Sequence, residues 1–192
     1  MVSPRIAIAA LTSALGFAHA AGLPPPQPSP LAQRPLVLPT LRTGEPCPIS
    51  MGRQDVVPLQ PHIFGAGGFW FGRGPVFVGL FWKEALESRA VFELAPVSRV
   101  RNTYSAKTGW VSEPSYAGPI LIRGRALDAE TPLEFGASSS EQKPDLQLVA
   151  PNVREPDLWS FWPSSMWITG PSCYGIQIDT TSGTEVVVFR AR

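Results

Sequence analysis

The chain has 192 residues, a formal net charge of +1, 44% hydrophobic residues and 22 prolines. A nearly neutral chain gives no support for electrostatic steering toward nucleic acid or an anionic membrane, so we expect no nucleic-acid partner. The length and apolar content suffice for one domain with a substantial core.

Residues 1–20 have the pattern of a secretory signal peptide. Arg5 gives a short positive start, Ile6 to Phe17 is mostly apolar, and Ala18-His19-Ala20 is a small-x-small cleavage site. The alternative is a buried N-terminal helix. The apolar stretch is short for a membrane span, and no later one is long enough to cross a bilayer. We therefore expect a soluble protein that is secreted or held in the periplasm or cell envelope.

Residues 21–46 are dense in proline and predict a tether. Repeated proline removes backbone donors and favours an extended, mobile chain. Within this stretch, Leu36-Val37-Leu38 is expected either as a short edge strand or as a segment draped over the core. The folded domain is expected to span residues 47–192.

Cys47 and Cys173 are the two cysteines of the chain. In an exported protein the pair predicts one disulfide that closes a loop over most of the domain. Two free buried thiols are the alternative.

Short β-rich runs with Pro/Gly-rich connections predict an all-β antiparallel sandwich, with no convincing amphipathic helix. Cys173–Asp179 and Thr184–Arg190 should form a terminal hairpin through Thr180-Thr181-Ser182-Gly183. The stretch from Trp159 to this hairpin is expected as an aromatic loop. The other expected strands are Pro75–Trp82, Arg89–Leu94, Pro119–Arg125, Leu133–Phe135 and Asp145–Ala150.

Two segments carry a family resemblance, and together they cover about a third of the chain. The first, within Thr108 to Asp128, contains Trp110, Pro114, Ser115, Tyr116, Gly118, Pro119, Gly124, Arg125, Leu127 and Asp128. The second, within Trp159 to Phe189, contains Trp162, Pro163, Ser164, Trp167, Cys173, Tyr174, Gln177 and Asp179. These segments resemble those of a group of small exported bacterial proteins without an assigned function, so the resemblance implies no activity. Pro171-Ser172 stands where that group commonly has a glycine before the cysteine.

The order Cys47, Trp82, Cys173 also resembles immunoglobulin-like sandwiches, in the loose architectural sense. The two cysteines are too far apart for a standard domain of that kind. No tyrosine lies two residues before Cys173 to form the tyrosine corner.

Catalytic and metal chemistry finds little support in the sequence. His62 is the sole histidine after residue 20, and it lies between Pro61 and Ile63 with no G-x-S-x-G motif in the chain. The cysteine and histidine spacings match no compact zinc motif, so we expect no metal and no cofactor. A carboxylate-dependent hydrolase is an alternative function, with four acids near aromatic residues as candidates: Glu113, Asp128, Asp157 and Asp179.

Arg123 and Arg125 flank Gly124 in an expected strand, so alternation places both side chains on one face. With Asp128 nearby, they form either an internal Arg–Asp pair, which we favour, or a site for a carboxylate ligand.

An aromatic set is the other candidate binding surface. It is formed by Trp159, Phe161, Trp162, Trp167 and Tyr174. These rings either form a platform for a sugar or a protein partner, or cover the open end of the sandwich. The sequence thus predicts an exported, non-catalytic binding or structural module of unknown ligand, with an extracellular protein or a polysaccharide as the candidate partner. A carbohydrate-binding module using exposed tryptophans is a further alternative.

Overall fold

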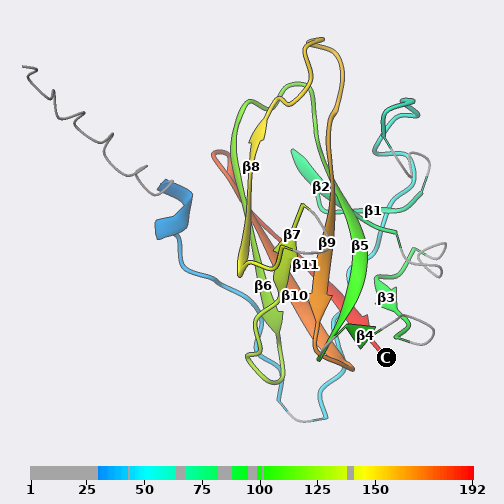
Figure 1. The fold of residues 1–192 in the computed structure, drawn as a ribbon, viewed down its shortest axis with the longest axis vertical. Helices are drawn as coiled ribbons and strands as arrows, with labels where there is room; N and C mark the ends of the chain where they lie inside the picture. Colours follow the sequence, from blue (N-terminus) through cyan, green and yellow to red (C-terminus); the bar gives the residue numbers. More distant parts are fainter. Residues whose placement is uncertain are drawn as a thin grey trace, which may run out of the picture.

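The computed structural model describes residues 30–42, 44–63, 68–81, 88–94, 99–100, 102–137 and 141–192. The protein is nearly all β, and two sheets pack against each other (Figure 1). The predicted all-β sandwich with one disulfide is confirmed. The expected signal peptide at 1–20, residues 21–29 and Trp82 lie outside the described residues. In the part described, no helix is long and apolar enough to cross a membrane.

A six-stranded antiparallel sheet forms one layer. Its order is β1-β2-β5-β9-β7, with β4 paired to the end of β5. The bounds are β1 Trp70–Phe71, β2 Val76–Leu80, β4 Arg99–Val100, β5 Thr103–Ser112, β7 Glu134–Gly136 and β9 Ser160–Ile168.

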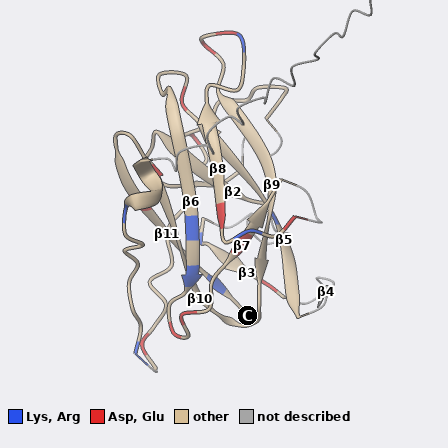
Figure 2. Ribbon diagram, turned by 60° about the vertical axis from the view of Figure 1, so that its left-hand side comes forward, with Lys and Arg blue, Asp and Glu red and all other residues tan. Residues whose placement is uncertain are grey.

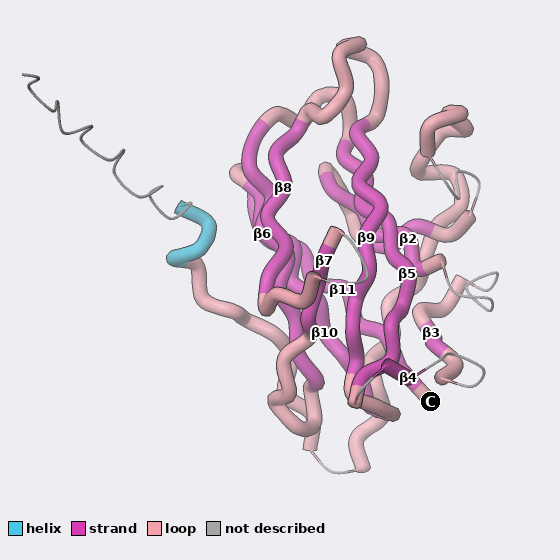
Figure 3. Tube along the Cα trace, in the orientation of Figure 1, coloured by secondary structure: helices cyan, strands magenta, loops and turns pink. Residues whose placement is uncertain are grey.

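A five-stranded sheet in the order β3-β11-β10-β6-β8 forms the other layer (Figure 3). Its strands are antiparallel except for the short parallel pairing of β3 with β11. The bounds are β3 Val91–Phe92, β6 Gly118–Ala126, β8 Asp145–Ala150, β10 Ser172–Thr180 and β11 Gly183–Ala191.

The terminal hairpin forms as expected, one residue longer at each end. Thr180 pairs with Gly183 at the turn, and Ser172 pairs with Ala191 at the other end. Two side chains stabilise the tight turn, because Thr180 Oγ1 lies 3.0 Å from Ser182 Oγ and donates to the Gly183 carbonyl at 3.2 Å.

The two central strands of the six-stranded sheet differ from the expectation. Residues 160–168 form β9 and not an aromatic loop, and Thr103–Ser112 forms β5, where no strand was expected. Pro163 weakens the strand signal, but it is exposed and faces Gly109 of β5, where the pairing continues on both sides.

The main core lies between the sheets. Its aromatic members include Trp110, Phe135 and Phe189, all fully buried. A polar cluster links the adjacent strands β5 and β9 on the core side of the six-stranded sheet: Trp110 Nε1 donates to Ser164 Oγ at 2.7 Å, and Thr108 Oγ1 lies 2.7 Å from the same oxygen. The tryptophan N–H is thus satisfied in a buried setting.

The outer face of the six-stranded sheet is also covered. Phe77, Val111 and Phe161 form a row across β2, β5 and β9. Val57 and Ile63, from the irregular segment 52–63, pack on this row together with Trp70. This small second core explains why the irregular, proline-containing segment 52–63 packs against the domain.

A strap, defined as residues 30–42, covers the outer face of the five-stranded sheet. It begins with the 3-10 turn Pro30–Gln33 and runs along β10. Leu31 and Leu38 are buried, and Leu38 and Leu127 lie over Gly175. The second half of the predicted tether is therefore part of the folded domain, because its leucines and backbone groups find partners on the sheet.

Candidate functional site

The disulfide joins Cys47, five residues after the strap, to the start of β10, with 5.6 Å between the Cα atoms of Cys47 and Cys173. Backbone hydrogen bonds fix the neighbouring turn at the same place. Leu127 N donates to the Cys173 carbonyl at 2.8 Å, and Leu41 N donates to the Leu127 carbonyl at 3.0 Å. This end of the sandwich is therefore held by both a covalent and a hydrogen-bonded link.

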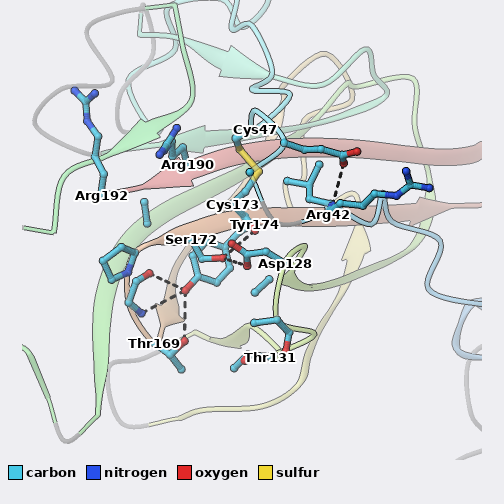
Figure 4. A pocket seen from close by; sticks show the side chains of 18 residues that line it. Arg42, Cys47, Asp128, Thr131, Thr169, Ser172, Cys173, Tyr174, Arg190 and Arg192 are labelled. Carbon is cyan, nitrogen blue, oxygen red and sulfur yellow. Dashed lines mark hydrogen bonds between the residues drawn. A yellow bond between two sulfur atoms is a disulfide. The ribbon is translucent and has the colours of Figure 1, made fainter.

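A pocket of about 600 Å³ lies beside this disulfide (Figure 4). Four segments that are far apart in the sequence form its walls: 41–47, 126–131, 169–174 and 190–192. Its volume falls in the range of small-molecule sites. Because the walls come from the disulfide-linked end, the shape of the pocket depends on the fold and not on one flexible loop.

Arginines stand on different sides of the pocket. Arg190 lies opposite Cys173 on the neighbouring strand and, with Arg192, on one side of the disulfide, whereas Arg42 lies on the other side (Figure 4). Arg192 pairs with Glu93. Among the described residues, the guanidinium groups of Arg42 and Arg190 have no hydrogen-bond or ion-pair partner, and both residues are exposed.

Polar oxygens complete the pocket. Ser172 Oγ donates to Asp128 Oδ1, and Glu45 Oε2 accepts the Arg42 backbone N–H at 2.9 Å. Thr131 and Thr169 add hydroxyl groups to the lining. The pocket therefore presents separate cationic groups together with carboxylate and hydroxyl oxygens.

The predicted aromatic set does not form one platform. Trp162 packs against the main core, whereas Trp159 belongs to the small outer core, 6.0 Å from Phe77 between ring centroids. Trp167 is buried, and so is Tyr174, whose ring stacks on Phe189 at 5.1 Å. Strand alternation in β9 separates the rings, because Trp162 faces inward and Trp159 and Phe161 face outward.

Tyr174 is the one aromatic residue of this set that lines the pocket. Its hydroxyl donates to the Gly170 carbonyl at 2.8 Å and accepts from Gly170 N at 3.3 Å. These bonds fix the turn between β9 and β10. A ring that is 1% exposed shapes the wall without offering a face for stacking.

Arg123 and Arg125 share one face of β6, as the alternation predicts, but neither pairs with Asp128. Arg123 Nη2 donates to Asp179 Oδ2 at 2.7 Å, and Arg125 Nη1 lies 4.0 Å from Glu130 Oε1. The basic positions of β6 are visible in Figure 2. Arg123 thus forms an internal Arg–Asp pair, but with a different aspartate from the one expected. The register places Arg123 opposite Gln177, and Asp179 is the next residue of β10 on the same face.

Asp179 is the centre of a buried network that the sequence reasoning did not identify. Its side chain is fully buried and accepts hydrogen bonds from Arg123, from Thr184 Oγ1 at 2.7 Å and from Gln177 Nε2 at 2.9 Å. Arg34 of the strap lies 4.0 Å away. A period-two signal was present, because Gln177 and Asp179 alternate with apolar residues in a strand.

The strap is bound to this network mainly through its backbone. Gln177 Nε2 donates to the Pro35 carbonyl at 3.0 Å, and Gln177 Oε1 accepts from Val37 N at 2.6 Å. Arg123 Nη1 donates to the Arg34 carbonyl at 2.9 Å, and Arg34 donates to the Thr180 carbonyl at 2.7 Å. This network therefore holds the strap and lies away from the pocket.

The remaining candidate groups have structural partners. His62 Nε2 lies 2.8 Å from the Trp159 carbonyl oxygen, and Gln60 Oε1 accepts from Trp159 N at 3.1 Å. Of the four candidate acids, Asp128 lines the pocket, whereas Asp179 is enclosed by the network. In the described part of the chain, no three His, Cys, Asp or Glu side chains form a metal-binding group.

Comparisons with known proteins add little to this picture. No family model matches the chain, and no solved structure matches it. Over 48 residues, the chain is 31% identical to the NADPH-dependent 7-cyano-7-deazaguanine reductase of Nitrobacter winogradskyi. The match covers 25% of this chain and 30% of that protein, so the chain spans less than a third of the curated relative.

Proposed function

We propose that the protein is an exported, non-catalytic binding module whose ligand occupies the pocket at the disulfide end. One observation carries this proposal: four distant segments and a disulfide together build a pocket of about 600 Å³ that is lined by both polar and apolar residues. Two arginines on its rim lack partners among the described residues. Exposed guanidinium groups on the rim of a recess are available to pair with an anionic group of a ligand.

Export is part of the same proposal. It is supported by the signal-like pattern of residues 1–20 and by a disulfide, which persists in oxidising compartments. N-terminal sequencing of the exported protein is expected to find Ala21 as the first residue. Membership in the group of small exported bacterial proteins and the loose immunoglobulin likeness remain predictions.

The alternatives draw less support from the geometry. A carbohydrate-binding module based on tryptophans needs several exposed rings in one plane, but Trp162 faces the core and Trp167 is buried. A carboxylate hydrolase needs two facing acids, and Asp179 is held in the network under the strap. Both alternatives remain proposals of lower rank.

The test is a thermal-shift screen of the mature protein against small saccharides, organic acids, amino acids and peptides. A pocket-filling variant, Ala129→Trp, is compared with Ala137→Trp, since both alanines are exposed and only Ala129 lines the pocket. Ligand at about 100 times its Kd adds about 2.7 kcal/mol to the free energy of unfolding.

We expect at least one compound class to raise the Tm of the wild type and of Ala137→Trp but not of Ala129→Trp. The bound compound should be recovered unchanged. No stabilisation by any class, or equal stabilisation of both variants, would leave the structural module as the better description.

A further inference from the structure

We propose that the pocket at the disulfide end binds an acidic saccharide, a short chain of uronic acid units, through its carboxylates. This inference rests on the proposed function and names the ligand class. It depends on the distribution of charge around the pocket, on the oxygens that can accept hydrogen bonds from a ligand, and on the lack of an exposed aromatic ring in the pocket lining.

The arginines supply the first argument. Arg190 and Arg42 stand on opposite sides of the disulfide and are exposed, and neither guanidinium has a partner among the described residues (Figure 4). A guanidinium matches a carboxylate in a bidentate geometry. Two separate free guanidinium groups fit a ligand that carries carboxylates at intervals better than a ligand with a single charge.

The oxygens supply the second argument. Asp128 is exposed at the pocket and already accepts a hydroxyl, from Ser172, through one oxygen. Its other oxygen has no partner among the described residues, and neither does Glu45 Oε1. Carboxylate oxygens are acceptors, so they suit a ligand rich in hydroxyl donors. Hydroxyl groups that donate to these two acids would offset the repulsion between the acids and the carboxylates of the ligand.

The walls supply the third argument. The pocket has about 600 Å³, and its one lining aromatic ring, Tyr174, is buried. An apolar or aromatic ligand would find little to stack on. The charged and hydroxyl groups of the lining therefore offer the specific contacts, and these match the chemistry of an acidic sugar.

The test titrates the mature wild-type protein with trigalacturonic acid and with its fully methyl-esterified form, by isothermal calorimetry and by NMR shifts. The ester keeps the sugar rings and removes the charges. The variants are Arg190→Ala and Arg190→Lys, with Arg154→Ala as the control, because Arg154 is an exposed arginine that does not line the pocket. Circular dichroism verifies the fold of each variant.

We expect Arg190→Ala to weaken trigalacturonate binding by about tenfold, the effect of one lost charge-assisted hydrogen bond. The ester should bind the wild type no more tightly than trigalacturonate binds Arg190→Ala. Arg190→Lys should bind trigalacturonate more tightly than Arg190→Ala does. Arg154→Ala should stay within about twofold of the wild type.

Equal binding of the acid and the ester, or equal affinity of wild type and Arg190→Ala, would overturn the inference. So would complete absence of saccharide binding, or much tighter binding of a glutamate-containing dipeptide, which would point to a zwitterionic ligand. The proposed function has a separate test. It fails only if no compound class in the screen loses its stabilising effect in the Ala129→Trp variant.

Discussion

Arg123 Nη2 of β6 lies 2.7 Å from Oδ2 of Asp179 on β10, and the carboxylate is fully buried. This ion pair lies under the strap, with Gln177 and Thr184 donating further hydrogen bonds to the same carboxylate. Removing one member of a buried pair leaves the other charge uncompensated, and that loss is larger than the net value of the pair.

Arg123→Ala is therefore expected to lower the free energy of unfolding by about 3 kcal/mol. Arg125→Ala is the matched control, on the same face of the same strand, with an exposed partner at 4.0 Å and an expected cost of about 1 kcal/mol or less. Urea denaturation with the disulfide intact measures both. Equal costs for the two variants would contradict the assigned role of the pair.

Gln177→Leu should release the strap from β10. The change removes the donor to the Pro35 carbonyl and the acceptor for Val37 N, and it leaves Asp179 with fewer partners. Amide exchange of Val37 should speed up, while that of Ile176 in the core strand changes little. Gln147→Leu, an exposed glutamine on β8, is the control. Unchanged exchange at Val37 would mean that the apolar contacts of the strap hold it without Gln177.

The double variant Cys47→Ser/Cys173→Ser is expected to lose about 5 kcal/mol of stability in the chain-entropy account, because the bridge closes a sequence separation of 126 residues. Urea denaturation of the variant against the oxidised wild type measures the loss. The reduced wild type should match the variant. A difference of less than about 1 kcal/mol would show that the backbone links around Leu127 fix this end without the bridge.

Gly109→Ala should disturb the outer face of the six-stranded sheet. A Cβ atom at Gly109 would lie 2.5 Å from Cε2 of Phe81 and 2.7 Å from Cε2 of Phe161. The expected cost is about 1–3 kcal/mol. Gly170→Ala is the control, since a Cβ there has no neighbour within 4 Å.

A double-mutant cycle locates the clash. If Phe81 limits the space, Gly109→Ala should cost less in a Phe81→Ala background than in the wild type. Chemical denaturation of the four proteins gives the coupling. If the stability losses of Gly109→Ala and Phe81→Ala are strictly additive, the strain comes from a neighbour other than Phe81.

Local sequence patterns predict part of this fold. Alternation and turn residues define the β10–β11 hairpin, and two cysteines in a chain whose first 20 residues have a signal-like pattern predict the disulfide. In both cases the deciding information lies in a few neighbouring residues or in a single pair. The predicted common face of Arg123 and Arg125 has the same origin, since strand alternation alone decides it.

Other features depend on partners distant in sequence. Trp162 and Pro163 suggest an irregular loop, but β5 on one side and β7 on the other extend this segment into a strand. The proline content of the strap predicts a mobile chain, but in the folded domain the strap packs on Gln177 and Gly175 of β10. The partner of Arg123 depends on the register between β6 and β10, which no local pattern specifies.

The pocket is also a product of long-range assembly. Arg42, Asp128, Ser172 and Arg190 come from four separate segments. Only Asp128 was a candidate from the sequence, and it was assigned there to a different partner. A constellation of this kind has no spacing motif, so its members are recognised only when the topology brings them together.

The course of the strap gives the domain a direction. The strap begins beside the β10–β11 turn, where Arg34 contacts Thr180 and Gly183, and it ends at Arg42 in the wall of the pocket. Residue 30, the first residue of the strap, therefore lies at the end of the domain remote from the pocket. A fusion partner or surface attachment placed there would hold the protein with its pocket facing outward, so N-terminal immobilisation is the orientation of choice for presenting this site to a ligand.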